Sequence, residues 1–512
     1  MGTPPFPDRA PAAWAREAAD TGVPHGPHTS MITSAFSQVG QIASQRSVHA
    51  ALAWLHLHEQ QIMRWQLECV AIPAPPFAES ARAAWIAARF EALGLADVHQ
   101  DEAGNVLGVL NPAPPIADPA ALPGQPPVIL LSAHMDTVFP GHTPLDPVLT
   151  GTRLRAPGAC DNGAGLAALF AVAAALRHAA IAPRCRIVFL GNVGEEGEGD
   201  LRGIRHIYAQ PHWRANIAAH LVLDGAGQTI AVTEALGSRR FEVLVTGAGG
   251  HSWTDAARPN PIVALSEAIT RLRSKQTSLS SSAEPAAKTN GHKGRDHARP
   301  KTRTTWSIGT IEGGSSVNAI PATATGRFDL RSTDAAELLH LEVELHRAVE
   351  DAVIAANRGC PAEHTLRFSI RNIGDRPAGA LPEDARILLL LRAVDRHLGL
   401  RTELRTASTD ANIPLALGVE AISLGAGGAG GGIHTTAEWF DGRGRDVGLR
   451  RILLLVLALA NCDADSPHEP DEPGHLDHLD EPDEDQLSNH NPGHAVENTP
   501  TDSLPQDPAA EL

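Results

Sequence analysis

The residues with the clearest chemical potential begin with His134 and Asp136, which directly follow the short apolar run 126–133. A run of this kind, bounded by prolines, predicts a core strand. Residues two apart in an extended segment point to the same side. A carboxylate beside an imidazole can hold one ring nitrogen while the other faces a metal or a proton. Taken alone, however, a His-x-Asp pair is as compatible with a structural role as with a site.

Four further polar positions follow predicted strands or stand beside glycines. They are the Asp161–Asn162 pair before a glycine-opened helix, the pair Glu195–Glu196, Asp224, and His434 after a glycine-rich loop. Each of them alone is compatible with an ordinary turn or a solvated surface position. Open α/β sheets, however, build their sites beyond the carboxyl ends of the strands. Because these residues and His134 all occupy such ends, the sequence predicts that they meet in one site.

The types of these residues indicate metal chemistry. Two imidazoles and three carboxylates suit a pair of zinc-type ions, with one carboxylate shared between the two. Without metal, the clustered carboxylates would repel one another. The adjacent pair Glu195–Glu196 allows one side chain to bind metal while the other works as a base. We therefore expect two divalent ions, with Zn2+ as the default and Co2+ or Mn2+ compatible with the same ligands.

The elements that must position these residues alternate along the chain. Apolar strand-like runs at 126–133, 184–193 and 218–227 are separated by helical patterns, of which 165–179 is the clearest. This alternation predicts an α/β fold in which a mostly parallel sheet is covered by helices on both faces. We assign residues 46–231 and 353–462 to this catalytic domain.

Between these two parts the pattern changes to strands and long helices, which predicts an inserted α+β domain at 232–352. Within it, residues 274–304 hold seven Lys or Arg against two acids and no apolar periodicity, which predicts a flexible basic loop. Residues 1–45 are rich in Pro, Ala and Ser, and 463–512 are strongly acidic. Both are predicted to be disordered tails.

Charge and cysteine content exclude several classes of protein. The formal net charge is −17, but the segment 463–512 carries fifteen Asp or Glu and no Lys or Arg. The rest of the chain is thus nearly neutral, and nothing in it resembles a nucleic-acid-binding module. The five cysteines are scattered without Cys-x-x-Cys spacing, which favours a reducing, cytoplasmic setting. No apolar run reaches the roughly 18 residues of a membrane span, and no export signal is evident.

A set of motifs stands in a fixed order along the chain. They are "AHMDTVFP", "PGACDNGAGLAAL", "VGEEGEGDLRG", "VLDGAG", "GAGGHSW", "GGSSVNAIPATATGRFDLRS" and "STDANIPLALG…GGGIHTTAEW". Together these motifs are highly specific, and they resemble the M20 family of dinuclear zinc peptidases and deacylases over roughly residues 48–462. This family includes tripeptide aminopeptidases, glutamate-releasing carboxypeptidases and N-acyl amino acid deacylases.

The resemblance implies a role for each residue of the predicted site. One metal would be held by His134, Asp161 and Asp224, and the other by Asp161, Glu196 and His434. Asp136 would orient His134, and Glu195 would be the general base. The family also implies a cis peptide bond between Asp161 and Asn162.

The inserted domain corresponds by the same resemblance to a lid that also forms a homodimer. His251 would reach the partner subunit's site and stabilise the oxyanion. Asn318 and Arg331 would engage the substrate, with Arg331 suited to a carboxylate, although a surface arginine on a strand is also possible. Gly427–Gly432 would give backbone room near the substrate.

Three functions follow from this reading. The first is an exopeptidase that cleaves the amide bond of small peptides, favoured because an aspartate at the position of Asp224 resembles the tripeptidase and dipeptidase branches. The second is an N-acyl amino acid deacylase, which differs in whether the amino end of the substrate is free or acylated. The third is a catalytically silent binding protein on the same fold, which the loss of a ligand or of the base would favour.

Overall fold

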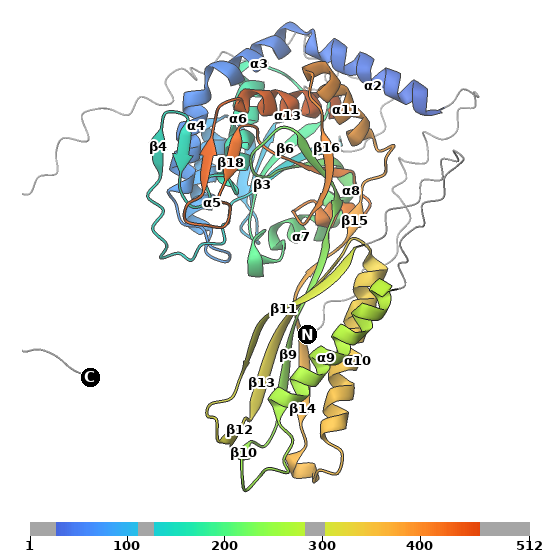
Figure 1. Cartoon of the computed structure of the whole chain (residues 1–512). Helices are drawn as coiled ribbons and strands as arrows, with labels where there is room; N and C mark the ends of the chain where they lie inside the picture. The colour runs from blue at the N-terminus through green and yellow to red at the C-terminus, as the bar shows by residue number, and fades with distance from the viewer. Residues whose placement is uncertain (1–26, 111–126, 282–302, 461–512) are drawn as a thin grey trace, which may run out of the picture. The chain divides into compact units, whose positions relative to one another are not determined.

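The largest element of the fold is a nine-stranded sheet, as far as the described residues extend. The computed structural model describes residues 27–110, 127–281 and 303–460 (Figure 1). The strands run in the order β1-β2-β6-β3-β7-β17-β8-β15, and β16 also pairs with β8. Their bounds are β1 Ala96–Gln100, β2 Val106–Leu110, β3 Val128–His134, β6 Arg186–Asn192, β7 Ile217–Leu223, β8 Ile230–Ala235, β15 Gly379–Ala380, β16 Glu403–Ala407 and β17 Ala421–Leu424.

The central strands β6, β3, β7 and β17 are parallel to one another. The carboxyl ends of β6, β3 and β7 therefore meet at one edge, which brings the segments that follow these strands together. The prediction of an α/β fold with a mostly parallel sheet is confirmed for this part of the chain. Further antiparallel sheets complete the mixed fold.

Helices cover both faces of this sheet because its central strands are apolar on both sides. In β3, Ile129, Leu131 and Ala133 pack into one buried cluster, and Val128 and Leu130 into another. The first cluster includes α6, which is buried from Gly163 to Leu176, and the second includes α7. The helices are α2 Pro27–Ala43, α3 Arg46–Leu57, α4 Glu59–Val70, α5 Ser80–Ala92, α6 Gly163–His178, α7 Arg202–Ala209, α8 Pro211–Asn216, α9 Pro261–Ser281, α10 Ala335–Ala356, α11 Arg386–Leu398, α12 Asn412–Ala416 and α13 Arg445–Leu459.

A second, antiparallel sheet has the strand order β11-β13-β9-β14. Its strands are β9 Gly237–Thr246, β11 Thr304–Gly313, β13 Thr323–Ser332 and β14 Arg367–Arg376. In β9, Phe241, Val243 and Val245 are buried, and the residues between them are more exposed. This alternation buries one face, which forms a separate core with α9 and α10 (Figure 1).

Two smaller sheets are formed by short strands. The sheet β18-β19-β5-β4 comprises Ala429–Gly431, Trp439–Asp441, Arg153–Arg155 and Val148–Thr150. The pair β10 (Gly250–His251) and β12 (Ala319–Ile320) brings together two segments that are far apart in the chain. Two short 3-10 helices, η1 Gly197–Gly199 and η2 Ala362–His364, complete the described elements.

The prediction of a disordered tail at 1–45 is wrong for its last part. Helix α2 covers Pro27–Ala43 and buries Ala35, Val39, Ile42 and Ala43. These four positions have the spacing i, i+4, i+7 and i+8, which is one face of a helix. This helical pattern is short and stands among polar residues. A prediction based on the composition of residues 1–45 therefore missed it. Residues 1–26 lie outside the described residues, and so do 461–512.

Two predicted boundaries of the inserted domain are also corrected. The basic loop does not begin at 274, because α9 continues to Ser281; the rest, 282–302, lies outside the described residues. The domain does not end at 352, because α10 reaches Ala356 and β14 (Arg367–Arg376) pairs with β9 of the same sheet. That pairing joins segments more than a hundred residues apart, which local periodicity cannot reveal.

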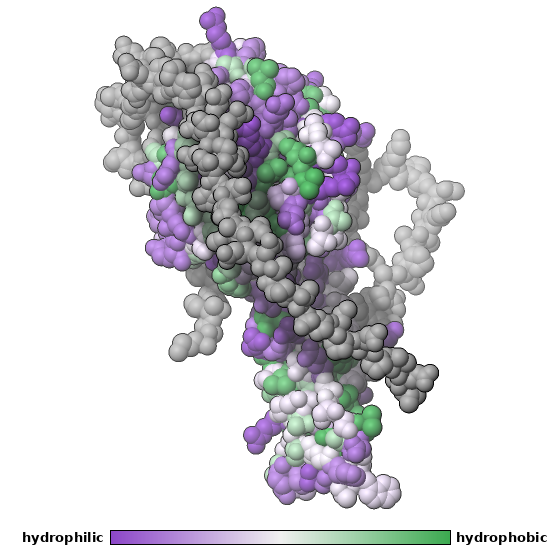
Figure 2. All heavy atoms as spheres, turned by 90° about the vertical axis from the view of Figure 1, so that its left-hand side faces the viewer, coloured by the Kyte–Doolittle hydropathy of each residue, from purple (hydrophilic) through white to green (hydrophobic). Residues whose placement is uncertain are grey.

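On the side that Figure 2 shows, hydrophilic residues cover much of the described surface, with smaller hydrophobic patches between them. Among the described residues, every helix is too short or too polar to cross a membrane.

Candidate metal centre

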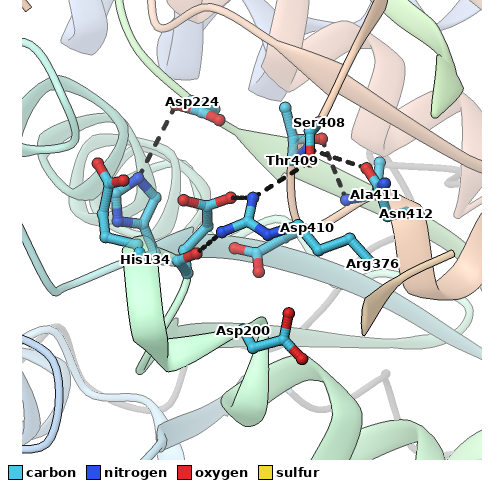
Figure 3. A network of polar contacts seen from close by, with 12 residues as sticks. His134, Asp200, Asp224, Arg376, Ser408, Thr409, Asp410, Ala411 and Asn412 are labelled. Carbon is cyan, nitrogen blue, oxygen red and sulfur yellow. Dashed lines mark hydrogen bonds and ion pairs between the residues drawn. The ribbon is translucent and has the colours of Figure 1, made fainter. Parts of the chain in front are cut away.

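His134 stands at the end of β3 with its two ring nitrogens directed at different carboxylates. Its Nδ1 lies 3.1 Å from the backbone oxygen of Asp136 and 3.6 Å from Oδ1 of the same residue. Its Nε2 lies 3.0 Å from Asp161 Oδ1. The same nitrogen lies 3.9 Å from Asp224 Oδ1 (Figure 3). One nitrogen is thus held by Asp136, and the other faces the acids that were predicted as its fellow ligands.

Asp161 lies between the two histidines. Its Oδ1 contacts His134, and its Oδ2 lies 3.2 Å from His434 Nε2. The Asp161–Asn162 peptide bond is cis. The Asn162 side chain donates to the backbone oxygen of Leu223, at the end of β7, and accepts from Gly165 at the start of α6. These bonds tie the Asp161 loop to the strand that carries Asp224.

Glu195 and Glu196 follow β6 and are oriented through their backbone. Asp136 accepts both of their N–H groups, at 2.9 Å from Glu195 and 2.8 Å from Glu196. Glu196 Oε1 lies 2.9 Å from His434 Nε2. Asp136 therefore contacts both His134 and the two glutamates, which is more than the single orienting role that the sequence predicted for it.

Among the described residues, the candidate ligand atoms form three overlapping groups, each within 4.8 Å. His134, Asp161 and Asp224 form one, and Asp161, Glu196 and His434 form the second. These are the two predicted ligand sets, and they share Asp161. The third group joins Glu195 to His134 and Glu196. The donors are imidazole nitrogens and carboxylate oxygens, which fit two zinc-type divalent ions.

The electrostatics of the centre reflect this concentration of acids. Burial raises the pKa of Glu196 to about 7, opposed by the nearby His134. Burial, together with the charge of Asp161, raises the pKa of Asp224 well above its usual value. Burial acts in the same direction on Asp161, but hydrogen bonds from His134 and His434 outweigh it and lower its pKa. Cations at this position would stabilise the ionised form of every acid in the set.

Both histidines have a pKa above the usual value of an imidazole. Hydrogen bonding to Asp161 raises the pKa of His434 to about 9. For His134, hydrogen bonds to Asp136 and Asp161 outweigh burial and raise the pKa well above its usual value. Both rings must deprotonate to bind metal. We therefore expect zinc binding at pH 7 to release protons and to weaken as the pH falls. Calorimetry in two buffers of different ionisation enthalpy measures the release, and identical heats in both would contradict it.

The predicted lid residues belong to none of the ligand groups found among the described residues. The β10–β12 pairing places His251 opposite Ala319, and Ser252 donates to the backbone oxygen of Asn318 at 3.0 Å. His251 and Asn318 are thus close in space, and both are exposed. Arg331 is on β13, where its Nε donates to Asp329 Oδ2 at 2.7 Å.

Glu438 is a contributor that the sequence analysis missed. Its carboxylate accepts the N–H groups of Gly158, Cys160 and Asp161 at 2.7–3.0 Å, and it is fully buried. The only sequence signal is its position four residues after His434 in "GGGIHTTAEW". A Cβ at Gly430 would collide with Cys160 Sγ, so the glycine-rich loop packs directly on the Asp161 loop that Glu438 holds.

Replacing Glu438 by Ala is expected to lower the free energy of unfolding by about 3 kcal/mol, because buried N–H groups lose a charged acceptor. Zinc affinity should fall about 10–100-fold, as for other partners that orient ligands. Thermal unfolding and zinc titration measure the two effects. The control is Glu403→Ala, whose carboxylate is exposed and bonds only to Arg405 among the contacts described. Unchanged zinc affinity in a destabilised Glu438→Ala protein would contradict the orienting role.

Two further residues were missed. Arg376, the last residue of β14, donates to Glu195 Oε1 at 2.9 Å. Asp410 is fully buried and accepts from Asn192 Nδ2 at 2.8 Å. Burial and the charge of Glu195 raise the pKa of Asp410 to about 7. Asp410 lies within the quoted motif "STDANIPLALG", whereas Arg376 lies outside every motif.

Comparison with known proteins identifies the family. Residues 130–461, well over half of the chain, match the model of peptidase family M20/M25/M40. The chain belongs to this family. A probable carboxypeptidase of Aspergillus clavatus is 28% identical over 313 residues, which are 58% of this chain and 62% of the relative. The chain thus covers less than two thirds of that relative's length.

Solved structures of the M20 family share the fold at low identity. A tripeptidase of Staphylococcus aureus aligns with a TM-score of 0.60 at 21% identity, covering 78% of this chain and 98% of that one. The YXEP protein of Bacillus subtilis, described as a dinuclear metal binding peptidase from the M20 family, aligns at 0.54 with 14% identity, covering 78% and 98%. The predicted M20 resemblance is confirmed, and membership in this family supports a hydrolytic enzyme.

Proposed function

We propose that the protein is a two-metal exopeptidase that cleaves the amide bond of small peptides. The observation that carries this proposal is the shared position of Asp161, whose two oxygens face His134 and His434 respectively. A carboxylate with this arrangement suits the bridge between two ions. The names of the M20 neighbours support a peptide substrate, because they include the tripeptidase of Staphylococcus aureus and a dipeptidase of Saccharomyces cerevisiae.

The metals would be held by His134, Asp161 and Asp224 on one side and by Asp161, Glu196 and His434 on the other. Bound there, two zinc ions would supply the Lewis acidity that activates a water and stabilises a developing oxyanion. Zinc is the expected metal, and cobalt or manganese suit the same donors.

The residues of the chain move the proton. Glu195 takes the proton of the attacking water on its carboxylate and delivers it to the nitrogen of the departing amine. Burial raises the pKa of Glu195, which strengthens it as a base, while the neighbouring Arg376 opposes the rise. Asp136 keeps Glu195 in place through the backbone N–H of that residue.

The four-stranded sheet with β10 and β12 is proposed as the lid and dimerisation domain. His251 would stabilise the oxyanion in the partner subunit's site, while Asn318 and Arg331 would bind the substrate. The exposed positions of His251 and Asn318, side by side at β10 and β12, support a contact with a second subunit. A reducing, cytoplasmic location is supported by the free thiols of Cys69, Cys160, Cys185 and Cys360.

The test uses zinc-loaded protein with matched di- and tripeptides, either free or N-acetylated, and mass spectrometry of the products. Cleavage of the free peptides alone is the expected result. Cleavage of the acetylated substrates alone would instead assign the protein to the N-acyl amino acid deacylases. If two metals bind and neither set is cleaved, the exopeptidase proposal fails, and a silent binding protein on this fold becomes the better description.

A further inference from the structure

Arg376 holds the proposed base at two points. Its Nη1 donates to Glu195 Oε1 at 2.9 Å, and its Nη2 donates to the backbone oxygen of the same residue. Both side chains are nearly fully buried, at 7% exposure for Arg376 and 8% for Glu195. The backbone N–H of Glu195 also donates to Asp136. Glu195 is thus held at its N–H, its carbonyl oxygen and its carboxylate. A guanidinium suits this task because its planar fork reaches two acceptors at once.

The position of Arg376 is itself fixed by its neighbours on β14 and on the loop after β6. Asp200 accepts the N–H of Asp375 at 3.0 Å, and Arg205 donates to the backbone oxygen of Asp375. On the opposite side, Arg376 Nη1 also donates to Ser408 Oγ at 3.2 Å (Figure 3). The backbone beside Arg376 is therefore held by the loop after β6 and by α7, and its guanidinium bonds to Ser408 as well as to Glu195.

Arg376 is also surrounded by negative charge. Burial disfavours its charged form, but Glu195, Asp410 and Asp200 outweigh that effect and raise its pKa. The guanidinium thus stays charged. An arginine kept charged at a buried position, with both terminal nitrogens on one glutamate, restricts the rotamer of that glutamate more than a neutral partner would.

We propose that Arg376 is a positioning residue for the general base. It binds Oε1 of Glu195 and so leaves Oε2 as the oxygen that takes and returns the proton. The geometry of proton transfer then depends on a side chain from β14 of the four-stranded sheet, although Arg376 belongs to none of the ligand groups. This inference rests on the proposed function, because it takes Glu195 to be the base.

Kinetics of Arg376→Ala test the proposal. Misplacement of a catalytic group by about 1 Å can cost about 10²-fold, so we expect kcat to fall about 10²-fold with KM changed less than about threefold. Guanidinium ion at non-denaturing concentration should restore at least part of kcat in Arg376→Ala but none in Glu195→Gln. The matched control is Arg371→Ala, also on β14, where an exposed arginine bonds to Glu242. Arg371→Ala should keep wild-type kinetics.

A crystal structure of metal-free Arg376→Ala provides a readout that does not depend on activity. We expect the Glu195 carboxylate to leave its wild-type position or to occupy two rotamers. If Arg376→Ala does not fold, Arg376→Lys replaces it, and a drop in kcat with unchanged KM is again expected. A lysine reaches only one of the two acceptors at a time, so its kcat should stay below that of the wild type.

The outcomes separate this inference from the proposed function. If the wild type cleaves peptides but the Arg376 variants keep its kcat, or change only KM, the positioning role is overturned and Arg376 is a structural ion-pair partner. An unmoved Glu195 carboxylate in the variant crystal overturns it as well. If the wild type cleaves nothing, the proposed function fails by that result alone, and the crystal structure still decides whether Arg376 sets the position of Glu195.

Discussion

Replacing Glu195 by Gln is expected to lower kcat about 10²–10⁴-fold, the usual contribution of a general base. The amide keeps the shape of the side chain and can still accept a hydrogen bond from Arg376, but it cannot take a proton from water. Metal content should remain at two ions, because Glu195 belongs to neither of the two ligand groups that share Asp161. Steady-state kinetics and elemental analysis of the same preparation measure both quantities.

The control for this prediction is Glu198→Gln, an exposed glutamate three residues further along the same loop. It should leave both kcat and metal content unchanged. Loss of a metal ion from Glu195→Gln would mean that Glu195 is a ligand, and turnover within about threefold of the wild type would remove it from the role of base. The companion variant Glu196→Gln should behave differently, because Glu196 contacts His434 rather than Arg376.

The adjacent glutamates are distinguished by structure rather than by sequence. In the sequence they form an indistinguishable pair, and only the family resemblance assigned their roles. In the structure, Glu195 turns toward Arg376 from β14, and Glu196 turns toward His434 from the glycine-rich loop. Both partners are more than 150 residues away in the chain. The sequence pattern around the two glutamates cannot predict these contacts. Side-chain periodicity indicates which positions are buried, but not which distant segment they contact.

The central part of the site was predictable for a physical reason. His134, the two glutamates and Asp224 follow β3, β6 and β7, which are neighbours in the sheet and parallel to one another. Parallel strands end at the same edge, so polar residues at successive strand ends must lie close together. The convergence of these residues follows from this rule, and the fold class follows from the alternation of strands and helices along the chain.

Other parts of the site and of the fold depend on contacts between distant segments, which the local sequence pattern does not predict. Glu438 anchors the Asp161 loop across 277 positions of sequence, and β14 completes a sheet whose other strands begin at Gly237. Helix α2 is a different case, because its apolar spacing was present but was outweighed by a Pro- and Ala-rich composition. A window limited to 27–43 would have identified it.

Replacing Asp161 by Asn tests the bridge most directly. Asp161 belongs to both ligand groups, with one oxygen toward His134 and the other toward His434. An amide offers one acceptor oxygen in place of two and carries no charge, so it cannot bind both ions. The loss of zinc affinity should exceed the about 10–100-fold typical of residues that only orient ligands, and it should affect both ions together. Turnover should fall below detection.

Asp224→Asn supplies the contrast, since Asp224 belongs to the group with His134 and not to the group with His434. Asp224→Asn should weaken the binding of one ion and leave the affinity for the second ion near the wild-type value. Asp97→Asn, an exposed position on β1, controls for the loss of a negative charge. Zinc titration of the metal-free proteins, with elemental analysis after dialysis, measures the number of ions and their affinities. One ion bound to Asp161→Asn with wild-type affinity would show that the two sites do not share this residue, because a bridging carboxylate cannot be removed from one ion alone.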